Sequence, residues 1–328
     1  MKHILGYKEH ENKDKVQWIK VKPVKSKVES DKLKELIELA TSELFEVFYL
    51  EENPFHKKMT KKRPILKYGV NEVKLHTLLA FNNLIEGDYY NNSAESLKSA
   101  DKKSWHEMLG NKDYLPLTVT DKREIKKLEF PIIAKPAEGH SGIGIMKFDT
   151  LEECEAEVNK QECVLDTYSE MVKDIDTEYR FLFVKDKVFL MHERVAIKKD
   201  NKTITTKKAN EELSFLYVEQ DLDKFTDSKQ LDDILIDFRK YVDLDFFALD
   251  ILVDKNGKYW LIESNSNAGM GGNTLARAYE GIYKDFFDTD IPQNKQKIID
   301  YICEEYYKEI NRMYPEEMKK SKNPKIYE

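Results

Sequence analysis

Residues 247–269 read FALDILVDKNGKYWLIESNSNAG, two apolar runs separated by an Asn-Gly pair. This pattern predicts two strands joined by a tight turn, because Asn-Gly is favoured in β-hairpin turns. Asp250 falls in the first strand, and Glu263 and Asn265 lie two residues apart at the end of the second. Side chains two apart in a strand point to the same face. We therefore expect the hairpin to bring three oxygen-bearing side chains together.

Two carboxylates and an amide on one sheet face are a candidate site for a hard divalent cation. Mg²⁺ takes a few protein oxygens and fills its remaining positions with water or phosphate. The alternative is that Asp250 and Glu263 are solvated charges beside a turn. In a buried hairpin, however, an uncompensated carboxylate is costly. The sequence therefore predicts that Asp250, Glu263 and Asn265 hold one or two Mg²⁺ ions, with Mn²⁺ as a possible substitute. The apolar residues that indicate burial are Phe247, Leu249, Ile251, Trp260 and Ile262.

The composition is that of a globular protein large enough for several subdomains. The chain has 328 residues, a formal charge of −7 and 41% hydrophobic residues, and a chain of this length buries a sizeable core. No apolar run approaches the roughly 18 residues of a membrane helix, and the first ten residues lack the apolar core of a secretory signal. Cys154, Cys163 and Cys303 are widely spaced and indicate neither a disulfide framework nor a zinc site. These features predict a cytoplasmic protein without membrane contact, and the mild acidity argues against general nucleic-acid binding.

A glycine-rich loop between two predicted strands is the second signal. The first strand ends at Lys135, and the next begins at about residue 145. Backbone N–H groups of such a flap close over phosphate oxygens, and Lys135 supplies a point charge to the same phosphates. The loop is neither a P-loop nor a Rossmann turn, because no helix follows the glycines. Ordinary turn structure is the alternative. The loop residues that we expect at the nucleotide are Gly139, Ser141, Gly142 and Gly144.

Together the two segments resemble the ATP-grasp superfamily. Its members carry a strand that ends in a nucleotide-binding lysine, a Gly/Ser-rich flap, an adenine-contacting strand and a later Asp…Glu-x-Asn metal set. The matching segments are 132–135, 139–144 and 163–168, followed by Asp250 and by Glu263-x-Asn265. The resemblance covers roughly residues 100–290, and Ala268 replaces the usual proline outside the metal ligands. It implies an α/β (α+β) fold in which two β-sheet subdomains hold a nucleotide.

The resemblance also implies roles for further basic residues. Lys103 matches a lysine that meets the α-phosphate; the adjacent Lys102 leaves the register open, and the spacing to the following Leu-Pro pair favours Lys103. The placement of Arg180 and Arg194 resembles that of arginines in the ribosomal-protein glutamate ligase branch. A guanidinium pairs bidentately with phosphate. We therefore expect Arg194 to act in catalysis with Lys135, and a structural salt bridge of Arg194 is the alternative.

Four residues are implied to contact the nucleoside. Asp166, Thr167 and Ser169 match the hinge that grips adenine, and Glu178 matches the acidic residue that accepts the ribose hydroxyls. For Asp166 and Glu178, exposed charges in an acidic loop are an equal alternative.

The resemblance implies an order of domains along the chain. The N-terminal α/β region lies on the substrate side, and the central subdomain carries the flap. The C-terminal subdomain carries the metal site, and a helical tail follows. We expect these regions at 1–110, 111–175, 176–292 and 293–328. In the first region, apolar residues at helical spacing predict one helix over 33–48.

The implied function is an ATP-dependent ligase. It activates a carboxylate as an acyl phosphate and joins it to the amine of an amino acid or peptide, releasing ADP and phosphate. The D-alanine–D-alanine ligase branch is similar in its metal segment. The alternatives are a kinase that phosphorylates a small-molecule hydroxyl and a non-catalytic ATP-binding module. The sequence leaves open both substrates and the question of a homo-oligomer.

Overall fold

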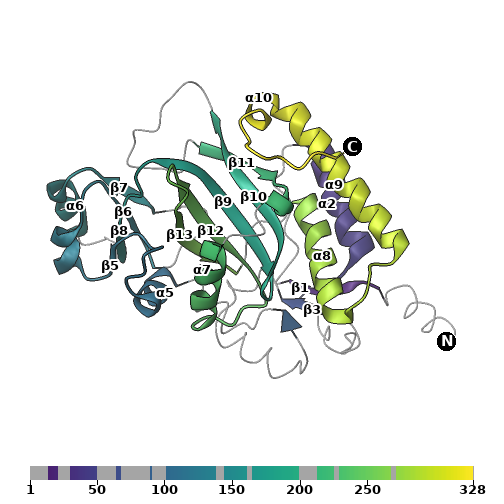
Figure 1. Ribbon diagram of the computed structural model, residues 1–328, viewed down its shortest axis with the longest axis horizontal. Coiled ribbons are helices and arrows are strands. Elements are labelled where there is room, and N and C mark those ends of the chain that lie inside the picture. The colour runs from purple at the N-terminus through teal and green to yellow at the C-terminus, as the bar shows by residue number, and fades with distance from the viewer. Residues whose placement is uncertain are drawn as a thin grey trace.

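The computed structural model describes ten stretches of the chain, and its strands form three sheets (Figure 1). In Figure 1 a small sheet and a five-stranded sheet lie next to each other, and a group of long helices lies at the opposite end from the small sheet. Within the described stretches, no helix combines the length and apolar character needed to cross a membrane. The described residues are 14–20, 30–49, 64–67, 89–90, 101–137, 144–160, 165–198, 213–224, 229–266 and 271–327.

The five-stranded antiparallel sheet lies at the centre of the molecule (Figure 1). The predicted hairpin is confirmed as β12 and β13, with Gly257 at a φ of 80° in the turn. Helix α7 (Lys229–Arg239) packs Phe238 against Phe247 of β12, with ring centroids 5.3 Å apart. Because side chains alternate along a strand, Asp250 lies on the opposite face. The strands are β9 (Ile175–Val184), β10 (Lys187–Lys198), β11 (Leu213–Glu219), β12 (Phe246–Asp254) and β13 (Tyr259–Asn265), in the order β11-β10-β9-β12-β13.

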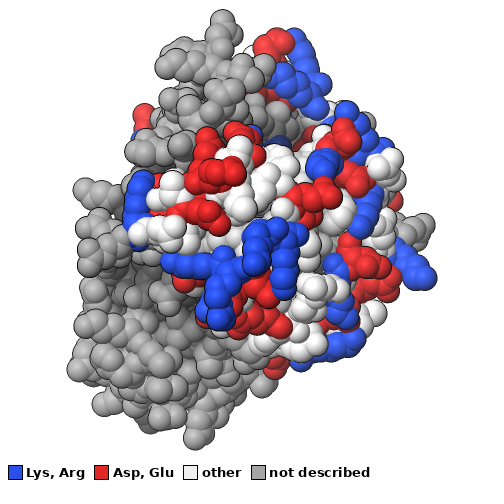
Figure 2. All heavy atoms as spheres, turned by 90° about the vertical axis from the view of Figure 1, so that its left-hand side faces the viewer, with Lys and Arg blue, Asp and Glu red and all other residues white. Residues whose placement is uncertain are grey.

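The small sheet is also antiparallel and contains the strand that ends in Lys135. Ile132 and Ala134 of this strand are buried against one layer of short helices, so Lys135 belongs to the other face. Ile132 pairs with Phe148, which confirms the predicted strands on both sides of the glycine-rich loop. The elements are η2 (Lys122–Lys127), α6 (Leu151–Val158), β5 (Thr118–Val119), β6 (Ile132–Lys135), β7 (Met146–Phe148) and β8 (Thr167–Glu170), with the sheet order β5-β8-β6-β7. Figure 2, which views the molecule from this side, shows basic and acidic side chains interspersed over the described surface.

A parallel sheet with the order β2-β1-β3-β4 is formed by the N-terminal residues. The predicted helix is correct only as far as Leu44, where α2 (Asp31–Leu44) ends. Phe48 lies in strand β2, so its assignment to the helix was wrong. The segment Phe-Glu-Val-Phe-Tyr is rich in aromatic and β-branched residues, which favour strands, and it pairs with β1. The strands are β1 (Val16–Lys20), β2 (Phe45–Tyr49), β3 (Ile65–Lys67) and β4 (Tyr89–Tyr90).

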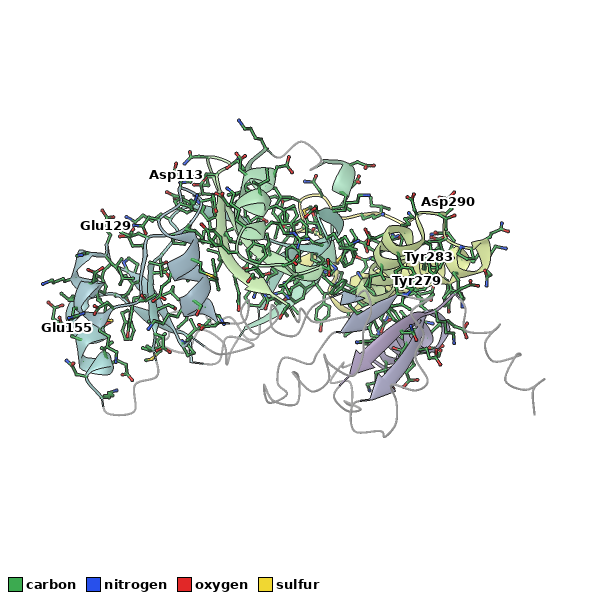
Figure 3. All side chains as sticks on the ribbon, turned by 90° about the horizontal axis from the view of Figure 1, so that it is seen from below. Asp113, Glu129, Glu155, Tyr279, Tyr283 and Asp290 are labelled. Atoms are coloured by element: carbon green, nitrogen blue, oxygen red, sulfur yellow. The ribbon has the colours of Figure 1, made fainter. Side chains whose placement is uncertain are left out.

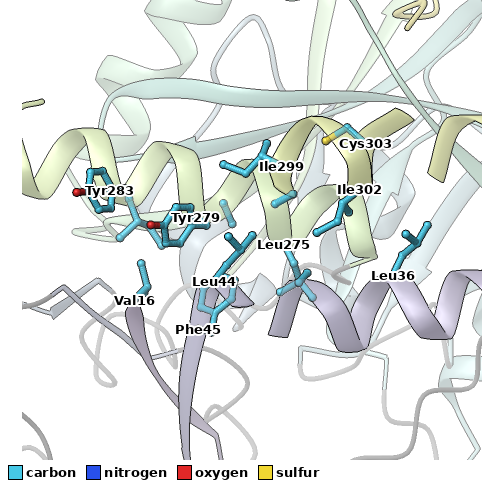
Figure 4. Packing of buried hydrophobic residues seen from close by; sticks show 14 of the residues in the cluster. Val16, Leu36, Leu44, Phe45, Leu275, Tyr279, Tyr283, Ile299, Ile302 and Cys303 are labelled. Atoms are coloured by element: carbon cyan, nitrogen blue, oxygen red, sulfur yellow. The ribbon is translucent and has the colours of Figure 1, made fainter. Parts of the chain in front are cut away.

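The C-terminal helices pack on α2 in one hydrophobic core (Figure 4). Leu36, Leu275, Ile299 and Ile302 all belong to this core. At Gly272 a Cβ atom would lie 3.1 Å from the Cβ of Leu36 and 3.3 Å from its carbonyl carbon, so glycine permits the close approach of two helices. The segment after residue 293 is helical as predicted, and it shares a core with the N-terminal region. The helices are α8 (Gly272–Phe287), α9 (Gln293–Met313) and α10 (Pro315–Met318).

Helix α8 also connects this core to the N-terminal sheet. Figure 3 shows Tyr279 and Tyr283 of α8 next to that sheet, whereas Glu155 lies at the far end of the molecule on the small-sheet side. The ring of Tyr279 contacts Phe45 edge-on at 6.1 Å, and its hydroxyl donates to the Asp14 carbonyl at 2.5 Å. The N-terminal sheet is therefore fixed to a helix that begins close to the end of β13.

Candidate active site

The candidate metal ligands lie on the polar face of the five-stranded sheet. In the register of the strands, Asp250 is opposite Glu263 on one side and opposite Arg180 on the other. Ala248 is opposite Asn265, so Asp250, Glu263 and Asn265 share one face as predicted. The amide Nδ2 of Asn265 donates to Oδ2 of Asp250 at 3.2 Å.

This arrangement fits the requirements of a magnesium site. Among the described residues, no group of three His, Cys, Asp or Glu side chains is arranged to hold a metal. Mg²⁺ nevertheless needs only one or two carboxylates when phosphates and water complete its shell. Asp250 and Glu263 supply two carboxylates from adjacent strands, and Asn265 adds an amide. The assignment of metal to these residues stays a prediction.

Arg180 is the immediate partner of Asp250. Its Nε lies 2.6 Å from Oδ1 and its Nη2 lies 2.7 Å from Oδ2, so the guanidinium engages both carboxylate oxygens. The ring of Tyr217 lies 5.0 Å from the guanidinium carbon. Burial by itself raises the pKa of Asp250, but the charge and hydrogen bonds of Arg180 outweigh it, and the net pKa lies below its ordinary value. Asp250 is therefore ionised at neutral pH.

The carboxylate of Glu263 is paired with a lysine from another part of the chain. Helix α5 (Lys102–Leu109) begins at Asp101, whose carboxylate accepts from the N–H groups of Lys103 and Ser104. This cap places Lys102 toward the sheet, where its Nζ lies 3.2 Å from Oε1 of Glu263 and its side chain is 9% exposed. Lys103 is only half-buried. Lys102 is thus the lysine that contacts Glu263, and which of Lys102 and Lys103 meets the nucleotide stays a prediction.

Lys135 approaches the same cluster from the small sheet. It is half-buried, and desolvation lowers its pKa, although the charge of Glu263 opposes this effect. Among the described residues, no carboxylate lies within ion-pair distance of its Nζ. Lys135 is therefore near Asp250 and Glu263 but forms no ion pair with a described carboxylate. This is the environment expected of a lysine that binds an anionic ligand.

Glu178 and Arg194 form the third acid–base pair of this face. Nη1 of Arg194 donates to Oε1 of Glu178, and the ring of Phe215 lies 4.1 Å from the guanidinium carbon. Burial raises the pKa of Glu178, and the charge of Arg194 partly offsets this shift. Both alternatives considered for Arg194 remain consistent with this contact. Glu178 is half-buried in the cluster and is not an exposed loop charge.

The predicted adenine hinge lies in and beside strand β8. Oδ2 of Asp166 accepts from the N–H of Ala137 at 2.9 Å and so fixes the chain just beyond Lys135. The hydroxyl of Thr167 donates to the carbonyl of Lys135 at 3.3 Å. Ser169 and Thr118 share a hydroxyl contact of 2.8 Å. These side chains hold the small sheet together, and their contact with adenine stays a prediction.

Most of the residues in the predicted flap lie outside the part of the chain that the structure describes. Gly139, Ser141 and Gly142 lie outside the described residues. Gly144 is described; its φ is 80°, a left-handed conformation that favours glycine. A Cβ atom there would also lie 3.3 Å from Cγ of Pro136. Glycine is thus required where the chain enters β7.

His106 is a residue of this site that the sequence reasoning missed. It lies one helical turn after Lys102, and the charges of Lys135 and Lys102 reach it. Partial burial, reinforced by these two charges, lowers its pKa to about 3, so the imidazole is neutral at pH 7. In a helix His106 lies on the same face as Lys102, four residues earlier. This spacing could have indicated His106 only if Lys102 had already been assigned to the site.

Two cavities border the central sheet. One of about 510 Å³ lies along the connection between the small and central sheets, where Met171 and Trp260 contribute to its lining. The other, of about 340 Å³, lies between the β9–β10 hairpin and α8. Neither is lined by Asp250 or Glu263. The candidate site is therefore defined by its charged side chains and not by a cavity.

Comparison with known proteins identifies the fold. No protein-family model matches the sequence, and no curated protein matches it either. Among solved structures, D-alanine–D-alanine ligase from Bacillus anthracis is 15% identical, with a TM-score of 0.55 over 90% of this chain and 99% of that one. The chain has an ATP-grasp fold. The predicted fold class is thereby confirmed.

Two further solved structures of this fold are described as complexes with a precursor. The macrocyclase MdnC bound with precursor peptide MdnA from Microcystis aeruginosa is 12% identical, with a TM-score of 0.52 over 84% of this chain and 100% of that one. The ATP-grasp ligase PsnB complexed with a minimal precursor is 14% identical, with a TM-score of 0.50 over 89% and 99% of the two chains. At these identities the likeness extends to the fold. In this ATP-grasp fold the small sheet and α5 supply Lys135 and Lys102, and the central sheet supplies Arg180, Asp250 and Glu263.

Proposed function

We propose that this protein is an ATP-dependent ligase that activates a carboxylate as an acyl phosphate and joins it to an amine, with release of ADP and phosphate. The observation that supports this proposal best is the charged cluster between the two sheets. Four basic side chains meet three carboxylates there, so the cluster retains a positive surplus before any ligand binds. Such a surplus suits a triphosphate. The members are Lys102, Lys135, Arg180, Arg194, Glu178, Asp250 and Glu263.

The basic residues would orient the phosphates from both sheets. Lys135 is available because no described carboxylate neutralises it at close range, and Lys102 lies next to it in the cluster. Positioning and charge stabilisation are the main contributions that a protein makes to phosphoryl transfer. We therefore propose Lys102 and Lys135 as phosphate ligands.

Asp250, Glu263 and Asn265 would hold one or two Mg²⁺ ions. When bound, the metal would neutralise charge on the phosphate oxygens. A carboxylate oxygen of the substrate attacks the γ-phosphorus, and the bond from this phosphorus to the bridging oxygen of ADP breaks. Arg180 and Arg194 lie on the same sheet face and are the groups proposed to offset the charge that develops during this transfer.

In the second half of the reaction an amine attacks the acyl carbon. The bond from this carbon to the phosphate oxygen breaks, inorganic phosphate leaves, and the amine nitrogen loses a proton. The protein need not supply a covalent nucleophile for either step. Exclusion of water from the site would protect the acyl phosphate from hydrolysis.

The substrates are proposed to be an amino acid or a peptide. D-alanine–D-alanine ligase shares the fold and, as its name states, joins amino acids. MdnC and PsnB share the fold; MdnC is described with a precursor peptide, and PsnB with a minimal precursor. The region that would hold such substrates is the N-terminal sheet together with the start of α8, which the contact of Tyr279 with Phe45 fixes to each other.

The test is ADP release from ATP in the presence of pools of amino acids and peptides. We expect phosphate release to require both a carboxylate and an amine, and a Glu263→Gln variant to show at least about a hundredfold lower turnover. The control is Glu155→Gln, which changes an exposed carboxylate on α6. Phosphate retained on an acceptor hydroxyl would indicate a kinase. Release of AMP would exclude both reactions.

A further inference from the structure

The carboxylates of the cluster are all neutralised by side chains of the protein itself. Each of the three has its own basic partner, and the partners come from three different elements. The pairs are Asp250 with Arg180 of β9, Glu263 with Lys102 of α5, and Glu178 with Arg194 of β10.

The pair between Arg180 and Asp250 is the most tightly constrained of the three. Both oxygens of Asp250 are engaged, at 2.6 and 2.7 Å, and the two side chains are 14% and 4% exposed. The two residues also face each other in the register of β9 and β12. The ring of Tyr217 braces the guanidinium at 5.0 Å. Arg180 therefore already binds both oxygens of the carboxylate that is proposed to bind a metal.

A divalent cation and this guanidinium compete for the same carboxylate. Both bind through its oxygen lone pairs, and two cations brought together on one buried carboxylate repel each other strongly. We infer that Arg180 is the counter-cation of Asp250 in the metal-free protein. When metal and nucleotide bind together, the guanidinium leaves Asp250 and binds a phosphate oxygen. This inference rests on the proposed nucleotide site.

This exchange makes the binding of metal and nucleotide cooperative. Without nucleotide, a metal ion must displace Arg180 and leave a half-buried guanidinium without a partner, which is costly. With nucleotide present, the displaced guanidinium finds a phosphate and forms a charge-assisted hydrogen bond. The metal alone therefore binds weakly, and each ligand strengthens the binding of the other by the same factor.

A merely structural role for Arg180 predicts the opposite effect of its removal. If the guanidinium only orients Asp250, then its loss weakens metal binding, because the carboxylate becomes mobile. If it competes with the metal, its loss frees Asp250 and strengthens the binding of metal alone. The sign of the change in metal affinity separates the two roles.

The experiment measures Mn²⁺ binding to the full-length protein by electron paramagnetic resonance of the free ion, with and without a nonhydrolysable ATP analogue. We expect Arg180→Gln to bind Mn²⁺ alone about fivefold or more tightly than the wild type, and to gain less from the analogue. Arg123→Gln removes a charge from the exposed η2 segment and is the matched control, with no change expected. The double variant Arg180→Gln, Asp250→Asn should lose the tighter Mn²⁺ binding, which would show that the ion binds at Asp250.

Unchanged or weaker binding of Mn²⁺ by Arg180→Gln would overturn the inference. If this variant does not fold, Arg180→Lys keeps the charge with fewer donors. Tighter Mn²⁺ binding by Arg180→Lys supports the inference, and unchanged or weaker binding overturns it. The proposed function fails separately: in that case the wild type binds no Mn²⁺ even with the analogue. If the wild type binds Mn²⁺ with the analogue and Arg180→Gln gains nothing without it, only the inference fails.

Discussion

Lys102 of helix α5 forms an ion pair with Glu263 of strand β13, with Nζ 3.2 Å from Oε1. The lysine side chain is 9% exposed, so this contact is mostly shielded from water. It joins the segment that leads into the small sheet to the strand that carries two of the candidate metal ligands. The nucleotide site proposed here is thus already assembled across two parts of the chain before a ligand binds.

This contact predicts which of two adjacent lysines binds phosphate. Lys102→Met should lower ATP affinity about tenfold or more, because hydrogen bonds to charged groups contribute about 1.5–3 kcal/mol. Lys103→Met is the matched control and should leave the affinity nearly unchanged, since Lys103 is not paired with Glu263 and its backbone N–H donates to the capping carboxylate of Asp101. Isothermal titration calorimetry with a nonhydrolysable analogue measures both. If Lys103→Met weakens ATP binding and Lys102→Met does not, then Lys103 is the phosphate ligand, as the spacing in the sequence indicated.

Lys135 is expected to favour ligand binding at the expense of stability. Its pKa is lowered by burial, which shows that the charged form is disfavoured in the folded protein. Lys135→Met should therefore lower ATP affinity about tenfold or more while the melting temperature stays the same or rises. Differential scanning calorimetry and titration on the same samples check the two effects. A variant that melts well below the wild type would show that Lys135 is a structural residue.

Gly144 allows the flap prediction to be tested against a matched glycine. Gly144 and Gly257 both have a φ of 80°, so replacement of either by alanine should cost about 1–2 kcal/mol of unfolding free energy. Only Gly144→Ala should also slow ATP turnover, because Gly144 borders the flap and Gly257 lies in the β12–β13 turn. Urea unfolding and steady-state kinetics separate the two effects. Equal rates of ATP turnover in the two variants would indicate that the glycine-rich loop is ordinary turn structure.

Two histidines should make the protein sensitive to acid. The pKa values of His106 and His192 are lowered from 6.5 to about 3, chiefly by burial. Between these values the unfolded chain binds protons that the folded protein does not, so the free energy of unfolding falls as the pH falls from about 6.5 to about 3. In the His106→Gln variant, about one proton fewer should be taken up on unfolding in this pH range, so the unfolding free energy should depend less steeply on pH. Urea unfolding at several pH values measures the slope, and an unchanged slope would contradict the assignment.

The sequence was sufficient to predict the central hairpin and the shared face of its polar residues. Alternating apolar residues around an Asn-Gly turn indicate the two strands, whereas the pairing of Asp250 with Glu263 also depends on a register shift between Asp250 and Ile251 that the alternation does not show. The fold class followed from the resemblance of these motifs, in their order, to the ATP-grasp superfamily. These features depend on local patterns, which a sequence shows directly.

The pairing of charges could not be predicted in the same way. Which cation reaches which carboxylate depends on how helix α5 and strand β9 pack on the hairpin, and these contacts join distant parts of the chain. Arg180 instead of Arg194 meets Asp250 because β9 is the neighbour of β12. The helix expected over 33–48 ends early for a related reason: pairing with β1 draws residues 45–49 into a strand.

The most direct test is a crystal of the protein grown with a nonhydrolysable ATP analogue and Mn²⁺. We expect the triphosphate to lie between β6 and the β12–β13 hairpin, beside Lys135, with an anomalous Mn²⁺ peak at coordinating distance from Asp250 and Glu263. An analogue bound elsewhere, or bound here with no metal at either carboxylate, would contradict the proposed site.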